Sequence, residues 1–222
     1  SSYFMLGYNK KDIFKGVGLK AGLALIHYSN SSVKSPNSSA NTFAATLGVN
    51  YQMDADTQPS YTTSAGFDKI KQPIHFNMVL RGGIQEGRVI GLGQKPFVVI
   101  SGYADKRLSF KSSIQVGVDA IFAKFLETEI AYSAAAFPAN GVTGDEDYKR
   151  VGVFVGYELH INKLSLIGQV GYYAYYPYKF EARVYLRPGL KYYITEKIFT
   201  VVTLKSHWAS AENVAFGVGF RI

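Results

Sequence analysis

A histidine and a serine, His27 and Ser29, stand two residues apart at the end of a segment in which apolar residues alternate. Because successive side chains of a β-strand point to opposite faces, residues i and i+2 share a face. The face of His27 and Ser29 also carries Val17, Leu19, Ala21, Leu23 and Leu25. An imidazole beside a hydroxyl is the base and nucleophile that acyl transfer uses. The spacing therefore predicts a reactive pair on the apolar face of a strand.

A second alternating segment, residues 41–53, follows the polar loop 30–40 and is expected to return beside the first. Asn41 has the same parity as the apolar residues of this segment, so we expect it to emerge beside His27 and Ser29. In this arrangement Ser29 attacks an ester carbonyl, His27 takes its proton, and Asn41 fixes the imidazole tautomer. Asn30 and Asn37, or the backbone N–H groups of the loop, are candidates for stabilising the oxyanion.

The elements that position these residues are strands. About ten segments alternate, each near the ~9–11 residues that a membrane-spanning strand needs. They run over 16–29, 41–53, 73–85, 95–104, 110–123, 148–161, 163–176, 182–195, 197–208 and 213–222. No charge lies mid-way along an apolar set, where Lys or Arg would cost about 2–4 kcal/mol at the bilayer midplane. The pattern predicts an all-β, antiparallel transmembrane β-barrel of the outer-membrane type.

The strand number and the loop lengths give the expected topology. Residues 1–9 can form one more strand, whose partner would lie outside this chain, so we expect about 10–12 strands in one domain over 1–222. Longer loops at 30–40, 86–94, 124–147 and 206–212 alternate with tight turns, and bacterial barrels place the longer loops outside. This scheme puts the connection 54–72 in the periplasm. Tyrosines at 172, 173, 175, 176 and 178, with Trp208, are expected to form an aromatic girdle near the outer rim.

Composition narrows the function classes. The 222 residues include no cysteine, which excludes a disulfide framework and a thiolate metal site. The net charge of +8 is spread over polar strand faces, where Arg183, Arg187 and Lys191 are expected to pair with Asp119 and Glu158. Nucleic-acid binding is therefore not expected. A diffusion porin is disfavoured, because side chains would fill the lumen of so narrow a barrel.

The segment HYSNSSVKSPNSSAN (residues 27–41), followed by TFAATLGVNY, resembles the active-site segment of the lipid A 3-O-deacylases, the PagL-type acyloxyacyl hydrolases. The closing LKSHWASAENVAFGVGFRI resembles the terminal strands of long family members from Bacteroidetes-type bacteria. The resemblance implies His27 as base and Ser29 as nucleophile, and it carries Asn30 and Asn37 over as site residues. It implies lipid A in the bacterial outer membrane as the substrate, with no cofactor.

One departure from the family concerns Asn41. The deacylases have a glutamate fourteen residues after the histidine, and no Asp or Glu stands between Asp12 and Asp54 here. An asparagine orients the imidazole without offsetting its charge, and Asp→Asn in a serine protease triad costs about 10⁴ in rate. Outer-membrane phospholipase A is similar in having His-X-Ser-Asn and an asparagine at that spacing. A phospholipase, which would bring calcium and dimerisation, therefore stays an alternative.

The other class of alternative is a non-catalytic barrel that serves as a structural or partner subunit among outer-membrane proteins. Further polar positions are weaker candidates for function. Lys34 in the loop could attract lipid A phosphates, with Arg88 or Lys149 at similar height. His207 with Glu212 is a second candidate polar site, and Asp145–Asp147 is interpreted as a solvated acidic tip. No metal site is expected.

Overall fold

The computed structural model describes residues 2–28, 33–34, 40–53, 72–208 and 210–222. Contacts divide the chain into two compact units, one built on the first three strands and the other on the remaining strands. Each unit is described by itself. The interpretation of residues 1–222 as one domain stays a prediction.

The first unit is an antiparallel sheet of three strands in the order β1-β2-β3: β1 (Ser2–Phe14), β2 (Val17–Tyr28) and β3 (Ala40–Tyr51). The register places Leu25 between Phe4 and Phe43, so one face is apolar over most of its length, with Lys10 opposite Leu19 near one end. The other face is mixed: it has Gly22 opposite Thr46, but also Met5 opposite Ala24. The sheet has the two unlike faces of a barrel wall.

The strand expected within residues 1–9 is confirmed and is longer than predicted, but its partner is β2 and not a strand outside this chain. A tight turn explains the difference. Lys15 and Gly16 both have positive φ, at 46° and 82°, which joins β1 to β2 as a hairpin. Asp12 accepts a hydrogen bond from the Gly16 N–H at 2.8 Å and steadies this turn.

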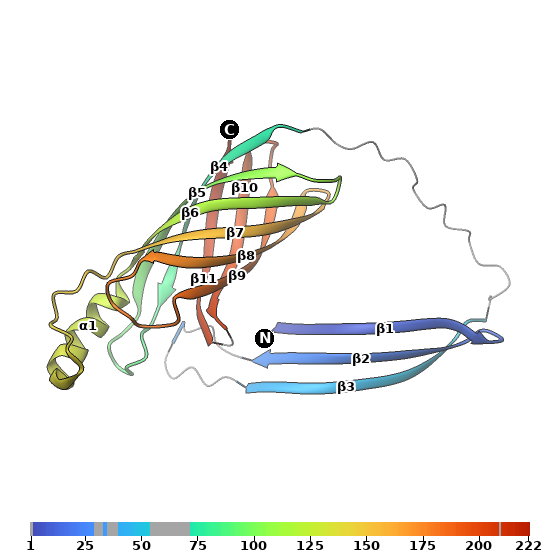
Figure 1. The fold of residues 1–222 in the computed structure, drawn as a ribbon, viewed down its shortest axis with the longest axis horizontal. Coiled ribbons are helices and arrows are strands. Elements are labelled where there is room, and N and C mark those ends of the chain that lie inside the picture. The colour runs from blue at the N-terminus through green and yellow to red at the C-terminus, as the bar shows by residue number, and fades with distance from the viewer. Residues whose placement is uncertain (1, 29–32, 35–39, 54–71, 209) are drawn as a thin grey trace. The chain divides into compact units, whose positions relative to one another are not determined.

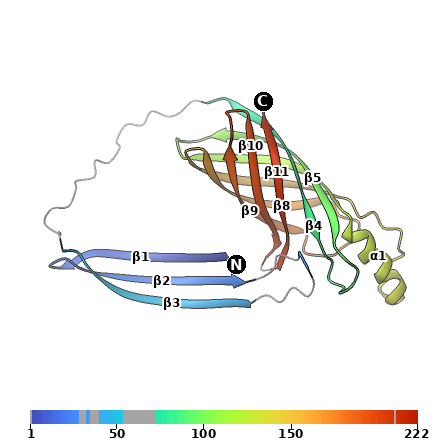
Figure 2. The same cartoon turned by 180° about the vertical axis from the view of Figure 1, so that it is seen from behind.

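The second unit is a closed ring of eight antiparallel strands (Figure 1). They are β4 (Ile74–Gln85), β5 (Lys95–Arg107), β6 (Ser112–Ala123), β7 (Arg150–Ile161), β8 (Leu164–Tyr175), β9 (Val184–Tyr193), β10 (Ile198–His207) and β11 (Ser210–Arg221). Each pairs with the next along the chain, and β11 pairs with β4, from Phe216 opposite Gly82 to Arg221 opposite Asn77. This last pairing closes the ring (Figure 2).

The fold class is confirmed as an all-β antiparallel barrel, but eight strands close it where 10–12 were expected. The positions of the strands agree with the alternating segments. Alternation indicates that a segment is a strand but not which strand it pairs with. The pairing of β11 with β4 joins the last two free strand edges and closes the ring. The strands β1–β3 therefore form a sheet of their own.

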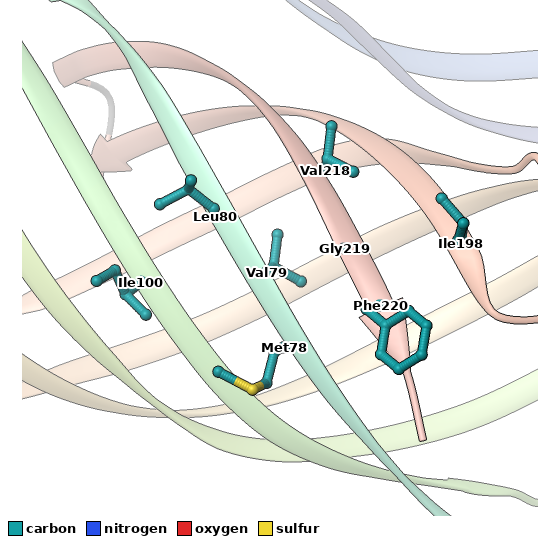
Figure 3. A pocket seen from close by; sticks show the side chains of 8 residues that line it. All are labelled: Met78, Val79, Leu80, Ile100, Ile198, Val218, Gly219 and Phe220. Carbon is teal, nitrogen blue, oxygen red and sulfur yellow. The ribbon is translucent and has the colours of Figure 1, made fainter.

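The ring has an apolar outer face. Around β4 and β11, Met78, Leu80, Val218 and Phe220 line a shallow apolar hollow together with Ile100 and Ile198 (Figure 3). The intervening Val79 points inward and is 2% exposed. This arrangement is the one expected of a wall that faces hydrocarbon.

Ion pairs lie in the lumen as the sequence predicted for Arg187 and Lys191, whereas Arg183 pairs with neither carboxylate and donates to the Tyr173 carbonyl at 2.9 Å. Arg187 pairs with Asp119 at 2.9 Å, and Lys191 pairs with Glu158 at 3.0 Å. Asp119 also accepts hydrogen bonds from Ser101 and Tyr185, both at 2.5 Å. All these groups are buried, and each carboxylate is satisfied by a cation and by neutral donors. The lumen is a packed polar core, as expected in a barrel of about eight strands.

The connection 124–147, expected to be a loop, contains the helix α1 (Phe125–Ala136) and a 3₁₀ turn, η2 (Pro138–Asn140). Phe125, Leu126 and Ile130 of α1 are buried, and Figure 1 shows the helix at one end of the ring. Apolar residues lie on all sides of this short helix, so they leave no clear period of 3.6 in the sequence. The described part of the chain contains no helix with the length and apolarity needed to cross a membrane.

The tyrosines expected to form a girdle divide between two environments. Tyr172, Tyr175 and Trp208 are exposed, in keeping with the expectation. Tyr173 is fully buried in the lumen, where its ring stacks on Tyr176 at 4.9 Å between centroids. Consecutive strand residues point to opposite faces, so a run of tyrosines cannot all lie on one face.

Candidate active site

His27 and Asn41 stand directly opposite each other at the ends of β2 and β3, joined by the loop 29–39. The His27 Nδ1 lies 2.7 Å from the Asn41 Oδ1. An amide oxygen can only accept, so Nδ1 donates and Nε2 keeps its lone pair. This tautomer is the one that a general base requires.

Strand register brings these two side chains together. Leu25 pairs with Phe43 two residues further in, so His27 and Asn41 share the apolar face of the sheet. Phe43 is 82% exposed, His27 is half-buried and Asn41 is exposed. The histidine is therefore accessible at the end of the apolar face of the sheet.

The structure describes only one of the other predicted site residues. Ser29, Asn30 and Asn37 lie outside the described residues, so their roles as nucleophile and oxyanion donors stay predictions. Lys34 is exposed and groups with the second unit, and its role toward phosphates also stays a prediction. The sequence did not assign a neighbour on the far side of His27, where β1 pairs Ser2 with it.

The second candidate, His207 with Glu212, forms a contact of 2.7 Å between Nε2 and Oε2 inside the ring. Lys205 Nζ lies 3.0 Å from the same carboxylate, and Arg150 Nη1 lies 3.7 Å from its other oxygen. All four side chains are buried. Two cations and a histidine surround one carboxylate, which makes the cluster part of the lumen core.

The acidic tip at 145–147 forms hydrogen bonds within its own loop. The carboxylate of Glu146 accepts hydrogen bonds from the backbone N–H groups of Thr143 and Gly144 at 2.8 and 3.0 Å. The bond from Thr143 lowers the pKa of Glu146. Among the described residues, no three metal-ligating side chains gather in one place.

Two family matches divide the chain where the structure divides it. Residues 1–50, which contain β1–β3 up to Asn50, match the lipid A 3-O-deacylase (PagL) family. Residues 74–222, which contain the ring, match the C-terminal domain of acyloxyacyl hydrolase. The chain belongs to the PagL family of acyloxyacyl hydrolases. The resemblance of the segment 27–41 is thereby confirmed at the level of the family, and an origin in Bacteroidetes-type bacteria stays a prediction.

Membership places the chain in a family of acyl hydrolases, and the family that residues 1–50 match is that of the lipid A 3-O-deacylases. A search of curated protein sequences gives no significant match. Among solved structures, a de novo designed transmembrane β-barrel is similar at 15% identity with a TM-score of 0.41, covering 69% of this chain and 99% of the design. Neisserial surface protein A is similar at 11% identity with a TM-score of 0.36, covering 67% and 95%.

Proposed function

We propose that this protein is an outer-membrane esterase that removes the 3-O-linked acyl chain of lipid A. The observation that carries the proposal is the 2.7 Å contact from His27 Nδ1 to Asn41 Oδ1, on the apolar face of a sheet that matches the deacylase family. A base held in its working tautomer at the edge of an apolar surface suits an ester that stays in the bilayer.

In the proposed reaction, His27 Nε2 takes the proton of the Ser29 hydroxyl as its oxygen attacks the acyl carbonyl. The oxyanion is stabilised by Asn30, Asn37 or backbone N–H groups of the loop. The imidazolium returns the proton to the leaving sugar hydroxyl, and the acyl chain stays on Ser29. Water, deprotonated by His27, then releases the fatty acid and restores the serine.

Asn41 orients His27 through the bond described above but carries no charge to offset the imidazolium. The proposed enzyme is therefore slower than one with a carboxylate at this position. An outer-membrane phospholipase with asparagine in this place is the alternative esterase. A non-catalytic partner barrel is the alternative without chemistry. Both alternatives keep the fold and differ in what happens to outer-membrane lipids.

Lys34 is proposed to attract a lipid A phosphate to the loop between β2 and β3. The side chain is exposed, and a charge-assisted contact to phosphate contributes about 1.5–3 kcal/mol. We expect Lys34→Glu to raise the apparent KM for lipid A and to leave kcat nearly unchanged. An unchanged KM would remove Lys34 from the site.

The test is mass spectrometry of lipid A and phospholipids from four bacterial strains. One expresses the unmodified protein, and the others express the variants Ser29→Ala, His27→Ala and, as the matched control, Ser31→Ala. We expect lipid A to lose one hydroxyacyl chain only when Ser29 and His27 are both present. Ser31→Ala should behave as the unmodified protein. Heat-modified gel mobility shows that each variant is folded and inserted.

Each other outcome selects an alternative. Lysophospholipid that depends on Ser29, with lipid A intact, would assign the protein as a phospholipase. No change in either lipid pool, with the barrel inserted, would favour the non-catalytic barrel. Deacylation that persists in Ser29→Ala would overturn the proposed nucleophile while keeping the proposed substrate.

A further inference from the structure

A polar cavity opens at the opposite end of the ring from α1, where β4 begins and β11 ends. Its volume is about 770 Å³, which lies in the range of small-molecule sites. The lining comes from the start of β4, the ends of β5, β7, β9 and β11, and the turns β7–β8 and β9–β10. Side chains from five strands and two turns thus meet around one space, far along the chain from the proposed esterase site.

The lining is strongly basic. Arg107, Lys163, Lys197 and Arg221 all contribute to it, whereas Glu196 is the one acidic side chain among the described residues that line it. Arg221 is already paired with Asp105 at 2.9 Å. In the part of the chain that the structure describes, the other three cations form no ion pair with a carboxylate. These three cations, one at the end of β5 and two in separate turns, have no carboxylate partner and make the cavity attractive to an anion.

The lumen carboxylates that contact residues of the cavity wall are committed to other partners. Asp105 accepts hydrogen bonds from Asn77 at 2.5 Å and from Arg221 at 2.9 Å. Glu158 accepts from Lys191 at 3.0 Å and from Gln115 at 2.8 Å. Neither is left over to neutralise the three cations, so the positive charge at the mouth stays unbalanced by the lumen network.

His75 adds a polar group that faces the same space. It lines the cavity, and its Nδ1 is buried with no hydrogen-bond partner among the described residues. A buried polar atom without a partner costs about 1–3 kcal/mol unless a ligand or water satisfies it. Nδ1 can donate to an acceptor that enters the cavity.

We propose that this cavity binds a phosphate group. Phosphate offers several acceptor oxygens and a double negative charge, which suit two lysines, a guanidinium and an imidazole donor converging from different directions. The group can come from free inorganic phosphate or from a phospholipid headgroup at this end of the barrel. Ile194 and Ile222 on the cavity wall offer contact for an attached acyl chain.

The experiment measures binding to the refolded full chain in a non-ionic maltoside detergent. Inorganic phosphate is titrated by calorimetry in one arm, and short-chain phosphatidic acid is titrated in the other. The variants are Lys163→Gln with Lys197→Gln, and His75→Phe, which removes the imidazole donor. The matched control is Lys95→Gln at the start of β5, at the other end of the ring.

Saturable binding in either arm that weakens about tenfold or more in the double lysine variant supports the site, provided that Lys95→Gln binds as the unmodified chain does. Binding confined to the phosphatidic acid arm assigns the source as a lipid, and binding in both arms assigns the phosphate group itself. Absence of binding in both arms overturns the proposal. Equal affinity in the double lysine variant, with the circular dichroism of the barrel intact, also overturns it.

Discussion

The ring and the three-stranded sheet share the same alternation and use it differently. In the ring, the polar face is turned into the lumen, where Asp119 with Arg187 and Glu158 with Lys191 form a buried core. In the sheet, the polar face carries small residues such as Gly22, and the histidine lies at the end of the apolar face. A polar group that breaks the apolar face, rather than one that follows the polar face, is the better pointer to chemistry.

The largest effect expected in this comparison comes from Asp119→Ala in the ring. The change leaves the Arg187 guanidinium buried without its carboxylate, which costs about 3–5 kcal/mol of unfolding free energy. Urea unfolding in lipid vesicles measures it. Asp145→Ala, which removes an exposed loop carboxylate, should stay within about 1 kcal/mol. Equal effects of the two changes would show that the lumen pair is not what stabilises the ring.

The next effect tests whether the apolar face of the sheet meets lipid as the outer face of the ring does. Leu47 on β3 is 90% exposed and Val116 on β6 is 59% exposed. We expect Leu47→Arg and Val116→Arg each to cost about 2–4 kcal/mol of insertion free energy in bilayers. Thr46→Arg, on the other face of β3, is the control. A penalty for Val116→Arg alone would mean that the sheet is not embedded as the ring is.

A smaller effect distinguishes the two faces of one strand of the ring. A Cβ added at Gly171 on β8 would collide with the Tyr185 ring in the lumen, whereas one added at Gly168 would meet nothing within 4 Å. We expect Gly171→Ala to lower the unfolding free energy by about 1–3 kcal/mol. Gly168→Ala should change it by no more than about 0.5 kcal/mol. A larger loss at Gly168 would contradict the assignment of inner and outer faces.

The smallest effect concerns the sheet and rests on the proposed reaction. Asn41→Glu places a carboxylate where Asn41 Oδ1 now bonds to His27, and it offsets the imidazolium formed during attack. We expect kcat for lipid A deacylation to rise about tenfold, measured by fatty acid release from mixed micelles. Asn41→Gln is the neutral control of the same length. A rise of kcat in both variants would indicate that the length of the side chain at position 41, and not its charge, increases the rate.

Much of the fold follows from the sequence because a period of two is a strong local signal. The alternating segments predicted β4–β11 to within a few residues, and the parity of His27 and Asn41 predicted their pairing. Which strand follows the last one around a ring is not local, so closure by β11 and β4 was not predicted. The hairpin turn at Lys15–Gly16 and the helix α1 were not predicted either, because neither contains alternating apolar and polar residues.

The geometry around Asn77 also has a consequence for the order in which the ring forms. The Arg221 Nε–H donates to Asn77 Oδ1 at 3.2 Å across a separation of 144 residues. Contacts between such distant residues form slowly, because the whole intervening chain must be brought back on itself. Until β11 arrives, β4 presents an unpaired edge that invites pairing with another chain. Loss of β11 would therefore be expected to yield aggregates during biogenesis, not a smaller barrel.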